Sequence, residues 1–269
     1  MIDLTGKNVF ITGGGSGIGK GISEVFALVG ANVVVSDINI DSAKLVADNL
    51  KGIGKFSYAH IDVTEKESVS KAVEYVINSH NAIDILINNA GIIGSGEWWE
   101  REISSDEDWQ EVYEVNVRGV VRVSQAVGEH MKSRRYGKIV NIASVAARQG
   151  SPDIPHYSTT KSAVVSWTQS NALQLAPFDI NVNAICPGLL WTPMWEAISR
   201  KRLKFTESSP EFKSLNGRKY FEKTVDKSVP MKKEQTPLDI GNMAVFLASD
   251  LSSNVTGQSI NVDGGRFMN

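Results

Sequence analysis

The fold is decided by residues 8–19, which read NVFITGGGSGIG. Their first four residues form a short apolar run of the kind found in buried strands. The glycines follow, and after them comes a helical pattern with apolar residues on one side. A glycine-rich turn between a strand and a helix lets the backbone approach a pyrophosphate and directs helix N–H groups towards it. The spacing, Gly13-x-x-x-Gly17-x-Gly19, is not the usual G-x-G-x-x-G fingerprint, and a glycine cluster alone is more often a flexible turn.

The next apolar run ends in an acid. Residues 32–37 read NVVVSD, and Asp37 follows Gly19 by eighteen residues. A carboxylate at this place can accept hydrogen bonds from an adenosine ribose 2′-hydroxyl, and it repels a 2′-phosphate. Neither the following Ile38 nor Ser16 in the glycine turn is basic, so no cation offsets that repulsion. The sequence therefore predicts NAD as the cofactor in preference to NADP.

A second group of polar residues surrounds Tyr157. Lys161 lies four residues after it, and Ser144 lies thirteen residues before it. Residues four apart are neighbours on one face of a helix, and an ammonium held close to a phenol lowers the pKa of the phenol. Lowering that pKa from about 10 to about 7, where a tyrosine exchanges protons at neutral pH, takes roughly 4 kcal/mol. The same spacing also occurs on solvated helix faces, so the pair alone is only a hypothesis of catalysis.

Taken together, these residues resemble the short-chain dehydrogenase/reductase family. The resemblance rests on the following motifs, which keep the family's order and usual spacings over essentially the whole chain: Thr12–Gly19, Asn88-Asn89-Ala90-Gly91, Asn116, Ser144, Tyr157-x-x-x-Lys161 and Pro187-Gly188. Each motif alone is weak, whereas the set is highly specific. The resemblance implies an NAD-dependent enzyme that interconverts a secondary alcohol and a ketone.

Four residues are candidates for the chemistry: Asn116, Ser144, Tyr157 and Lys161. Tyr157 is expected to act as general base towards the alcohol, or as acid towards the ketone. Lys161 would lower the pKa of that phenol and hold the nicotinamide ribose. Ser144 would orient the substrate oxygen and stabilise the charge that develops on it. In the family, the residue at Asn116 holds a water chain that leads to the lysine; an amide that satisfies a local helix kink is a compatible alternative.

The resemblance also implies a set of cofactor-binding residues. Asp62 and Val63 would contact the adenine edge, although Asp62 can equally cap the helix that follows it. The backbone of residues 89–91 would run beside the cofactor, while the amides of Asn88 and Asn89 also suit ties between neighbouring strands. The full set comprises Gly13, Ser16, Gly17, Ile18, Gly19, Asp37, Ile38, Asp62, Val63, Asn89, Ala90, Gly91, Tyr157, Lys161, Pro187, Gly188, Leu190 and Thr192.

Strands and helices alternate along the whole sequence. Apolar runs predict seven strands, at residues 8–11, 32–37, 55–62, 83–88, 138–144, 181–186 and 259–262, with helical patterns between them. We therefore expect an α/β fold, a doubly wound, Rossmann-like parallel sheet of about seven strands with helices on both faces. No repeat or linker divides the chain, so residues 1–269 are expected to form a single domain, with a substrate lid at about 193–234.

The substrate is less well determined. Residues 187–195, followed by the long lid, look like the small-polyol and acetoin-type members of the family, so a small polyol or hydroxyketone is the preferred substrate. The residues predicted to meet it, besides Ser144 and Tyr157, are Trp98, Arg148, His156 and Trp195. Trp98 and Trp99 could form either a pocket wall or a small separate core. Arg148, four residues beyond Ser144, is a candidate anion contact.

The lid region is basic. Residues 196–234 carry eleven Lys and Arg against six Asp and Glu, an excess of five positive charges. A basic lid can attract an anionic substrate, which keeps an acidic or coenzyme A-linked hydroxyacyl substrate as the alternative. A solvated helical surface explains the charge more simply and is preferred. A non-catalytic NAD-binding subunit or sensor is disfavoured, because such a protein could have lost the tyrosine or the lysine.

Composition narrows the remaining classes. A net charge of −2 argues against a dedicated nucleic-acid binder, and the single cysteine, Cys186, allows no internal disulfide. The sequence has neither a secretory signal nor an apolar run of membrane-spanning length. We therefore expect a cytoplasmic enzyme of a small molecule, with no membrane partner and no bound metal. By resemblance it is expected to be a homotetramer.

Overall fold

Seven apolar runs become the strands of one parallel sheet. In the computed structural model, which describes residues 2–206 and 210–268, the strands lie in the order β3-β2-β1-β4-β5-β6-β7. Their bounds are β1 (Asn8–Thr12), β2 (Asn32–Asp37), β3 (Lys55–His60), β4 (Ile85–Asn88), β5 (Gly137–Ile142), β6 (Ile180–Pro187) and β7 (Ser259–Val262). All neighbours are parallel. The order reverses between β1 and β4, and ligands of such sheets bind at this switch point.

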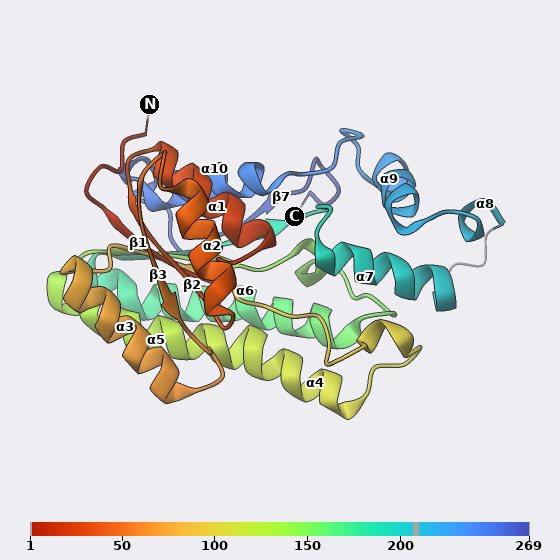
Figure 1. The fold of residues 1–269 in the computed structure, drawn as a ribbon, viewed down its shortest axis with the longest axis horizontal. Coiled ribbons are helices and arrows are strands. Elements are labelled where there is room, and N and C mark those ends of the chain that lie inside the picture. The colour runs from red at the N-terminus through yellow and green to blue at the C-terminus, as the bar shows by residue number, and fades with distance from the viewer. Residues whose placement is uncertain (1, 207–209, 269) are drawn as a thin grey trace.

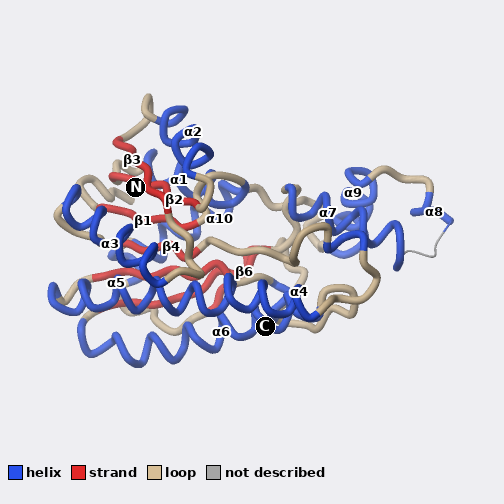
Figure 2. The backbone as a smooth tube through the Cα atoms, turned by 60° about the horizontal axis from the view of Figure 1, so that its bottom comes forward, coloured by secondary structure: helices blue, strands red, loops and turns tan. Residues whose placement is uncertain are grey.

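Helices cover both faces of the sheet, as the alternation of the sequence predicts. Figure 1 shows α1 (Gly17–Leu28), α2 (Ile40–Leu50) and α10 (Pro237–Ala248) on one side. The other side carries α3 (Lys66–His80), α5 (Val120–Arg134) and α6 (Pro155–Leu175), as Figure 2 also shows. Successive side chains of a strand point to opposite faces of the sheet. Val9 and Ile11 therefore pack in the hydrophobic core between the sheet and α1, whereas Phe10 packs in the core between the sheet and α3. The doubly wound fold is confirmed.

The helical segment between β4 and β5 is continuous but not uniform. It starts as α4 (Asp106–Tyr113), passes through a π-helical segment, Glu114–Gly119, and continues as α5. A capping box fixes its start, because the Ser105 side chain accepts from the Asp108 backbone and Asp108 accepts from the Ser105 backbone. The π-helical segment contains Asn116, the residue for which a local helix distortion was one of the two expectations.

A group of helices lies beyond the edge of the main body. It comprises α7 (Pro193–Lys201), a π-helical segment Arg202–Thr206, α8 (Pro210–Lys213) and α9 (Gly217–Ser228), seen at one end of the molecule in Figure 1. These elements fall within the lid expected at 193–234; residues 207–209 of that range lie outside the described residues. Short 3₁₀ turns occupy Trp98–Glu100, Val145–Ala147, Ala176–Phe178 and Asp250–Ser252.

Two strand ends differ from the expectation. β3 ends at His60 and β5 ends at Ile142, so Asp62 and Ser144 each lie two residues beyond a strand instead of closing it. This difference helps the site, because residues just past the carboxyl ends of parallel strands line the ligand crevice. Within the described parts of the chain, no helix is long and apolar enough to cross a membrane.

Candidate active site

A cleft of about 980 Å³ opens at the carboxyl ends of the strands. Every member of the predicted cofactor-binding set except Gly19 lines it, as do Ser144 and Trp195 among the predicted substrate contacts. These residues come from the carboxyl ends of six different strands, from the segments that follow those strands, and from α6. The structure therefore brings together residues that are up to about 180 positions apart in the sequence, from Gly13 to Thr192.

The glycine turn is shaped by contacts that a side chain would block. Gly13 has a φ of 64°, and a Cβ there would lie 2.7 Å from the Ala90 Cα. A Cβ on Gly19 would overlap the carbonyl oxygen of Gly13 and lie 2.6 Å from the Asn89 amide nitrogen. Gly19 thus lets α1 approach the loop after β4, which is why it matters without lining the cleft. The start of α1 lines the cleft, and its N-cap residue Ser16 makes no side-chain hydrogen bond to the helix. An uncapped helix N-terminus at a cleft fits a pyrophosphate.

The loop after β4 is tied to the glycine turn. The Asn89 amide donates to the carbonyls of Thr12 (3.1 Å) and Gly13 (2.7 Å), and the Thr12 hydroxyl accepts from the backbone of Asn89 and Ala90 (both 3.2 Å). Asn88 donates to Asn141 on β5 at 2.8 Å. The expected ties between strands are confirmed, and they hold residues 89–91 at the cleft wall.

Two acids of the predicted cofactor-binding set line the cleft. Asp37 accepts from the backbone N–H of Gly15 and of Asn39, both at 3.0 Å, which fixes its carboxylate at the cleft edge. Asp62 accepts from the backbone and the hydroxyl of Thr64 at 2.9 and 2.7 Å. The alternative that Asp62 caps the next helix is wrong, because α3 starts only at Lys66 and Asp62 closes a turn before it.

Tyr157 and Lys161 project from the first turns of α6 into the cleft. Both are buried, with exposed fractions of 8% and 5%. The Lys161 ammonium donates to the carbonyl of Ile142 at 2.9 Å and lies 5.6 Å from the centre of the Tyr157 ring. A Cβ at Gly91 would lie 3.4 Å from the Lys161 nitrogen. The ammonium therefore points into the protein beside the cofactor-side loop and away from solvent.

The predicted pKa of the tyrosine requires a correction. Burial raises the pKa of Tyr157 to about 12, and hydrogen bonding with Ser144 offsets only part of that effect. Burial likewise lowers the pKa of Lys161 to about 8. Desolvation disfavours the charged form of both groups, so the lysine of the protein alone does not bring the phenol near 7. The phenol is a proton donor at neutral pH unless a further positive charge enters the cleft.

Asn116 lies behind the cleft and does not line it. Its side-chain amide is fully buried and makes two hydrogen bonds with the backbone of one residue: it accepts from the Ile92 N–H and donates to the Ile92 carbonyl, both at 2.8 Å. A weaker bond reaches the Thr160 hydroxyl at 3.3 Å. A Cβ at Gly91 would lie 3.2 Å from the Asn116 oxygen, so only that glycine separates the amide from the lysine.

Three of the predicted substrate contacts lie elsewhere. Arg148 turns to the end of the sheet, where its guanidinium donates to Asn261 (2.9 Å) and to the carbonyl and hydroxyl of Ser259 (2.7 and 2.8 Å). It anchors β7 and is not an anion contact. Because side-chain direction around a short turn cannot be read from spacing, its four-residue distance from Ser144 was misleading.

The predictions that His156 and Trp98 contact the substrate fail for a similar reason. His156 precedes Tyr157 but points away from the cleft, where its ring hydrogen-bonds with the Ile93 carbonyl at 2.6 Å and contacts the Trp109 ring edge-on, with ring centres 5.9 Å apart. Trp98 is 5% exposed and packs in a small core with Ile93 and other apolar residues. The satellite-core alternative for Trp98 is therefore the right one, and neither residue lines the cleft.

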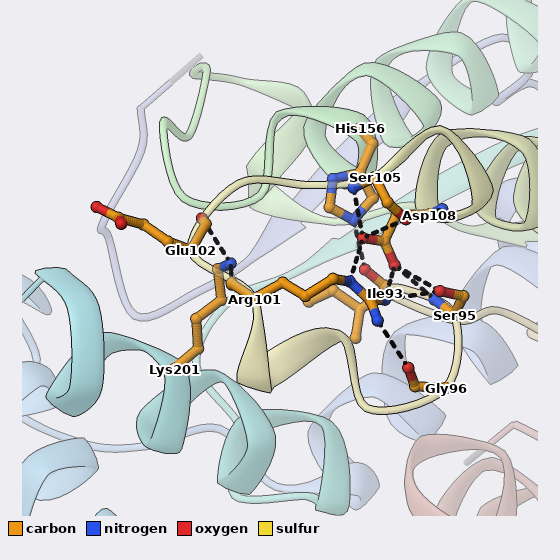
Figure 3. A network of polar contacts seen from close by, with 9 residues as sticks. All are labelled: Ile93, Ser95, Gly96, Arg101, Glu102, Ser105, Asp108, His156 and Lys201. Atoms are coloured by element: carbon orange, nitrogen blue, oxygen red, sulfur yellow. Dashed lines mark hydrogen bonds and ion pairs between the residues drawn. The ribbon is translucent and has the colours of Figure 1, made fainter.

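The loop that carries Trp98 also anchors the outer helices. Lys201 at the end of α7 donates to the carbonyls of Arg101 and Glu102. Figure 3 shows how Arg101 in turn holds Asp108, which also accepts from the Ser95 backbone at 2.8 Å. Although burial opposes it, these donors hold the pKa of Asp108 well below its usual range. The network holds one side of α7 against the loop between β4 and α4.

Sequence reasoning missed several cleft residues. Arg202 follows α7, Arg266 follows β7, and the side chains of Gln149, Met194, Ile198 and Phe267 also line the cleft. Arg266 carried a usable signal, since it comes just after the carboxyl end of a predicted parallel strand. Arg202 carried none, because it is one of eleven basic residues in its region. In residues 2–206 and 210–268, no cluster of His, Cys, Asp and Glu is arranged to hold a metal ion.

Comparison with known proteins agrees with this geometry. A family model described as enoyl-(acyl carrier protein) reductase matches residues 13–266. Over 98% of this chain and 98% of the relative, the chain is 35% identical to 3-oxoacyl-(acyl-carrier-protein) reductase FabG of Chlamydia pneumoniae. It is 37% identical to galactitol 2-dehydrogenase of Agrobacterium fabrum, over 98% and 99%. A solved structure of NAD+-bound xylitol dehydrogenase superposes with a TM-score of 0.88 at 30% identity, covering 97% and 99%.

The doubly wound sheet, the glycine turn and the Ser144–Tyr157–Lys161 group define an oxidoreductase of the nicotinamide-dependent class. More particularly, the chain belongs to the short-chain dehydrogenase/reductase family. The resemblance read from the sequence motifs is confirmed.

Proposed function

We propose that this protein is an NAD-dependent dehydrogenase that interconverts a secondary alcohol and a ketone, on a small polyol or hydroxyketone. The observation that carries the proposal is the placement of Ser144, Tyr157 and Lys161 in the same cleft as the glycine turn. The proposal is also supported by the relatives named galactitol 2-dehydrogenase and xylitol dehydrogenase. Bound NAD would supply the hydride acceptor, which is chemistry that side chains do not provide.

The side chains would handle the proton and the substrate oxygen. Tyr157 takes the hydroxyl proton during alcohol oxidation and returns it during ketone reduction. Ser144, whose hydroxyl opposes the rise in the pKa of Tyr157, would hold the substrate oxygen and stabilise its developing charge. Because burial raises the pKa of Tyr157 to about 12, positive charge is needed to make it a base. Lys161 and the oxidised nicotinamide ring would supply that charge together.

Asn116 would act on Lys161 only indirectly. Its amide holds the Ile92 backbone, directly after Gly91, and keeps open the space that the Lys161 ammonium shares with that loop. We propose that it positions the lysine and supports proton exit along that side. Asp37 would set the cofactor preference, because its carboxylate would meet the adenosine ribose and repel a 2′-phosphate.

An anionic or coenzyme A-linked hydroxyacyl substrate is the second candidate. It is favoured by the arginines Arg202 and Arg266 at the cleft and by the relative named a 3-oxoacyl reductase. In both cases the segment at about 193–234 would be the lid that covers the substrate. We also propose that the enzyme is cytoplasmic and a homotetramer, which light scattering after size-exclusion chromatography would test.

A substrate screen tests the proposal. The purified protein is incubated with NAD+ or NADP+ and a panel of polyols, hydroxyketones, hydroxy acids and hydroxyacyl thioesters, and NADH or NADPH formation is followed. We expect reduction of NAD+ by at least one secondary alcohol and a clear preference over NADP+. Binding of NAD+ with no turnover of any panel member would contradict the proposal and favour a non-catalytic NAD-binding protein.

A further inference from the structure

Two arginines reach the substrate end of the cleft from distant parts of the chain. Arg202 begins the segment after α7, and Arg266 follows the turn that ends β7. Burial lowers the pKa of Arg266, and the positive charge of Arg202 lowers it further. The two guanidinium groups therefore lie close enough for their charges to repel each other.

The two arginines differ in how their charges are balanced. Arg202 forms an ion pair with Asp153, whose side chain is 6% exposed, at 2.6 Å. No side chain among the described residues forms an ion pair or hydrogen bond with the Arg266 guanidinium. The nearby Asp263 does not take that role, because its two oxygens accept from the backbone of Gly265 (2.9 Å) and Phe267 (2.8 Å). Arg266 thus has no ion-pair or hydrogen-bond partner for its guanidinium in the cleft, although the carboxylate of Asp263 attracts it from farther away.

Four other cations of the outer helices are paired with nearby acids. Arg200 pairs with Glu196 at 2.6 Å, and the same holds for Lys204 with Glu100, Arg218 with Glu222 and Glu234, and Lys223 with Glu211. These pairs are largely solvent-exposed, so much of the positive excess of residues 196–234 belongs to a solvated surface, as expected. Arg266 differs from these paired, exposed cations because it is partly buried and has no ion-pair partner. Burying an unpaired charge costs free energy.

Both guanidinium groups are also held against aromatic rings of the cleft. The Arg202 Cζ lies 5.4 Å from the centre of the Trp195 ring, and the Arg266 Cζ lies 5.6 Å from that of Phe267. Such contacts restrain the planar groups. A restrained guanidinium with free N–H groups suits two-point binding of a carboxylate or phosphate.

We propose that Arg266, supported by Arg202, forms an anion-binding subsite, and that the secondary alcohol used by this enzyme carries a carboxylate or phosphate group. The proposal rests on the alcohol–ketone interconversion proposed above, and for the substrate it selects the anionic second candidate in place of a neutral polyol. Arg266 would bind the anion directly. Arg202, already shared with Asp153, would add charge and fix the Trp195 side of the pocket.

Matched substrate pairs test the subsite. One pair is 3-hydroxybutanoate and 3-hydroxybutanamide, and the other is sorbitol 6-phosphate and sorbitol; their responses distinguish carboxylate from phosphate. In each pair whose anionic member is turned over, Arg266→Met should raise the KM of that member by about 10- to 100-fold, the effect of losing a charge-assisted hydrogen bond. The KM of the neutral member should stay the same, and Arg266→Lys should restore part of the loss.

Arg200→Met is the control, because Arg200 is an exposed arginine that pairs with Glu196 and does not line the cleft. It should leave both KM values unchanged. Arg266→Met should also melt close to the wild type, since it loses only the contact with the Phe267 ring and no ion pair or hydrogen bond. A wild type that prefers the neutral member of both pairs would overturn the proposal, as would an Arg266→Met variant that changes both members equally.

A binding measurement separates this proposal from the proposed function. Calorimetry with the NAD+-bound protein, in which the cofactor has no hydride to give to a ketone, measures the affinity for 3-oxobutanoate and for inorganic phosphate directly, without turnover. We expect binding of at least one, weakened about 10- to 100-fold by Arg266→Met and reduced by added salt. Binding that is insensitive to Arg266, or no binding of either anion, overturns the subsite even if neutral alcohols are oxidised. Arg266-dependent binding without any oxidation would instead contradict only the proposed function.

Discussion

The glycine turn at one end of the cleft and the arginine pair at the other are positioned by different means. The turn is backbone: its shape follows from a positive φ at Gly13 and from the close approach of α1 to the loop after β4. The arginines are long side chains from two segments, one after α7 and one after β7, held by Asp153 and by aromatic rings. The shape of the end with the glycine turn is thus fixed by the backbone fold. The other end depends on side chains that can be replaced without changing the fold.

This contrast predicts how substitutions divide. Substitutions at the cofactor end should change the affinity for the dinucleotide, whichever substrate is used in the assay. Changes at the substrate end should alter the KM of particular substrates and leave dinucleotide affinity alone. Tyr157 and Lys161 lie between the two ends of the cleft. Substitutions there should change neither dinucleotide affinity nor the KM of one particular substrate; they should change turnover, for Tyr157, or the pH dependence of stability, for Lys161.

The largest effect is expected at Tyr157. Tyr157→Phe removes the hydroxyl that exchanges the substrate proton, and kcat should fall on the order of 10³-fold. NAD+ affinity, measured by fluorescence titration, should be largely unchanged because the ring remains. Tyr75→Phe, an exposed tyrosine on α3, is the matched control and should behave like the wild type. Normal turnover in Tyr157→Phe would refute the assignment.

Lys161 should reveal its burial through the pH dependence of stability. Its folded-state pKa is lowered to about 8 from the ordinary 10.5, so between these pH values the unfolded chain holds the proton more tightly. The contribution of Lys161 to stability is therefore unfavourable at low pH and recovers as the pH rises from about 8 to 10.5. Relative to Lys161→Met, the wild type should gain on the order of 3 kcal/mol over that range.

Urea unfolding at several pH values measures this difference. The exposed Lys71 on α3 provides the control, and Lys71→Met should show no such trend. If the gap between the wild type and Lys161→Met were the same at pH 7 and pH 10, the ammonium would not be desolvated as described.

Asp37 should act only on the dinucleotide. Asp37→Ala removes the acceptor proposed for the ribose hydroxyls, so the Kd for NAD+ should rise by about 10- to 100-fold, while NADP+ binding should improve. The same change should appear with every substrate. Asp41→Ala, in the exposed first turn of α2, is the control. A variant that keeps its preference for NAD+ would show that the cofactor choice lies elsewhere.

The smallest effect is expected at Trp195 on the substrate side. Trp195→Ala removes an apolar surface of the pocket, so the KM of the alcohol should rise on the order of 10-fold, with the Kd for NAD+ unchanged. Trp109→Ala, at a 41% exposed position outside the cleft, is the comparison. An equal loss of NAD+ affinity in Trp195→Ala would break the division between the two ends.

The same contrast explains what the sequence could predict. Strand number, the glycine turn, Asp37 and the Tyr157–Lys161 pair depend on local patterns and on the order of strands, and all of them lie where they were expected. Even the distortion of the helix at Asn116 was foreseeable from an asparagine in a helix interior. These features follow from backbone rules that have few alternatives.

The errors concern the directions of side chains. His156 is one residue from Tyr157 and Arg148 is four from Ser144, yet both point away from the cleft. Arg266 lies far along the chain and does line it. The pKa of Tyr157 was predicted too low for the protein alone, because a motif shows which charge is near but not how much solvent is lost. Tertiary burial decides such questions, and spacing does not report it.

The most direct test of the central claim follows one labelled hydrogen. An accepted secondary alcohol, deuterated at its carbinol carbon, is incubated with NAD+ and the enzyme, and the NADH is analysed by mass spectrometry and NMR. The account predicts deuterium on the nicotinamide ring with the wild type, and no NADH above background with Tyr157→Phe, although that variant still binds NAD+. Label lost to water, or label transfer that persists in Tyr157→Phe, would contradict it.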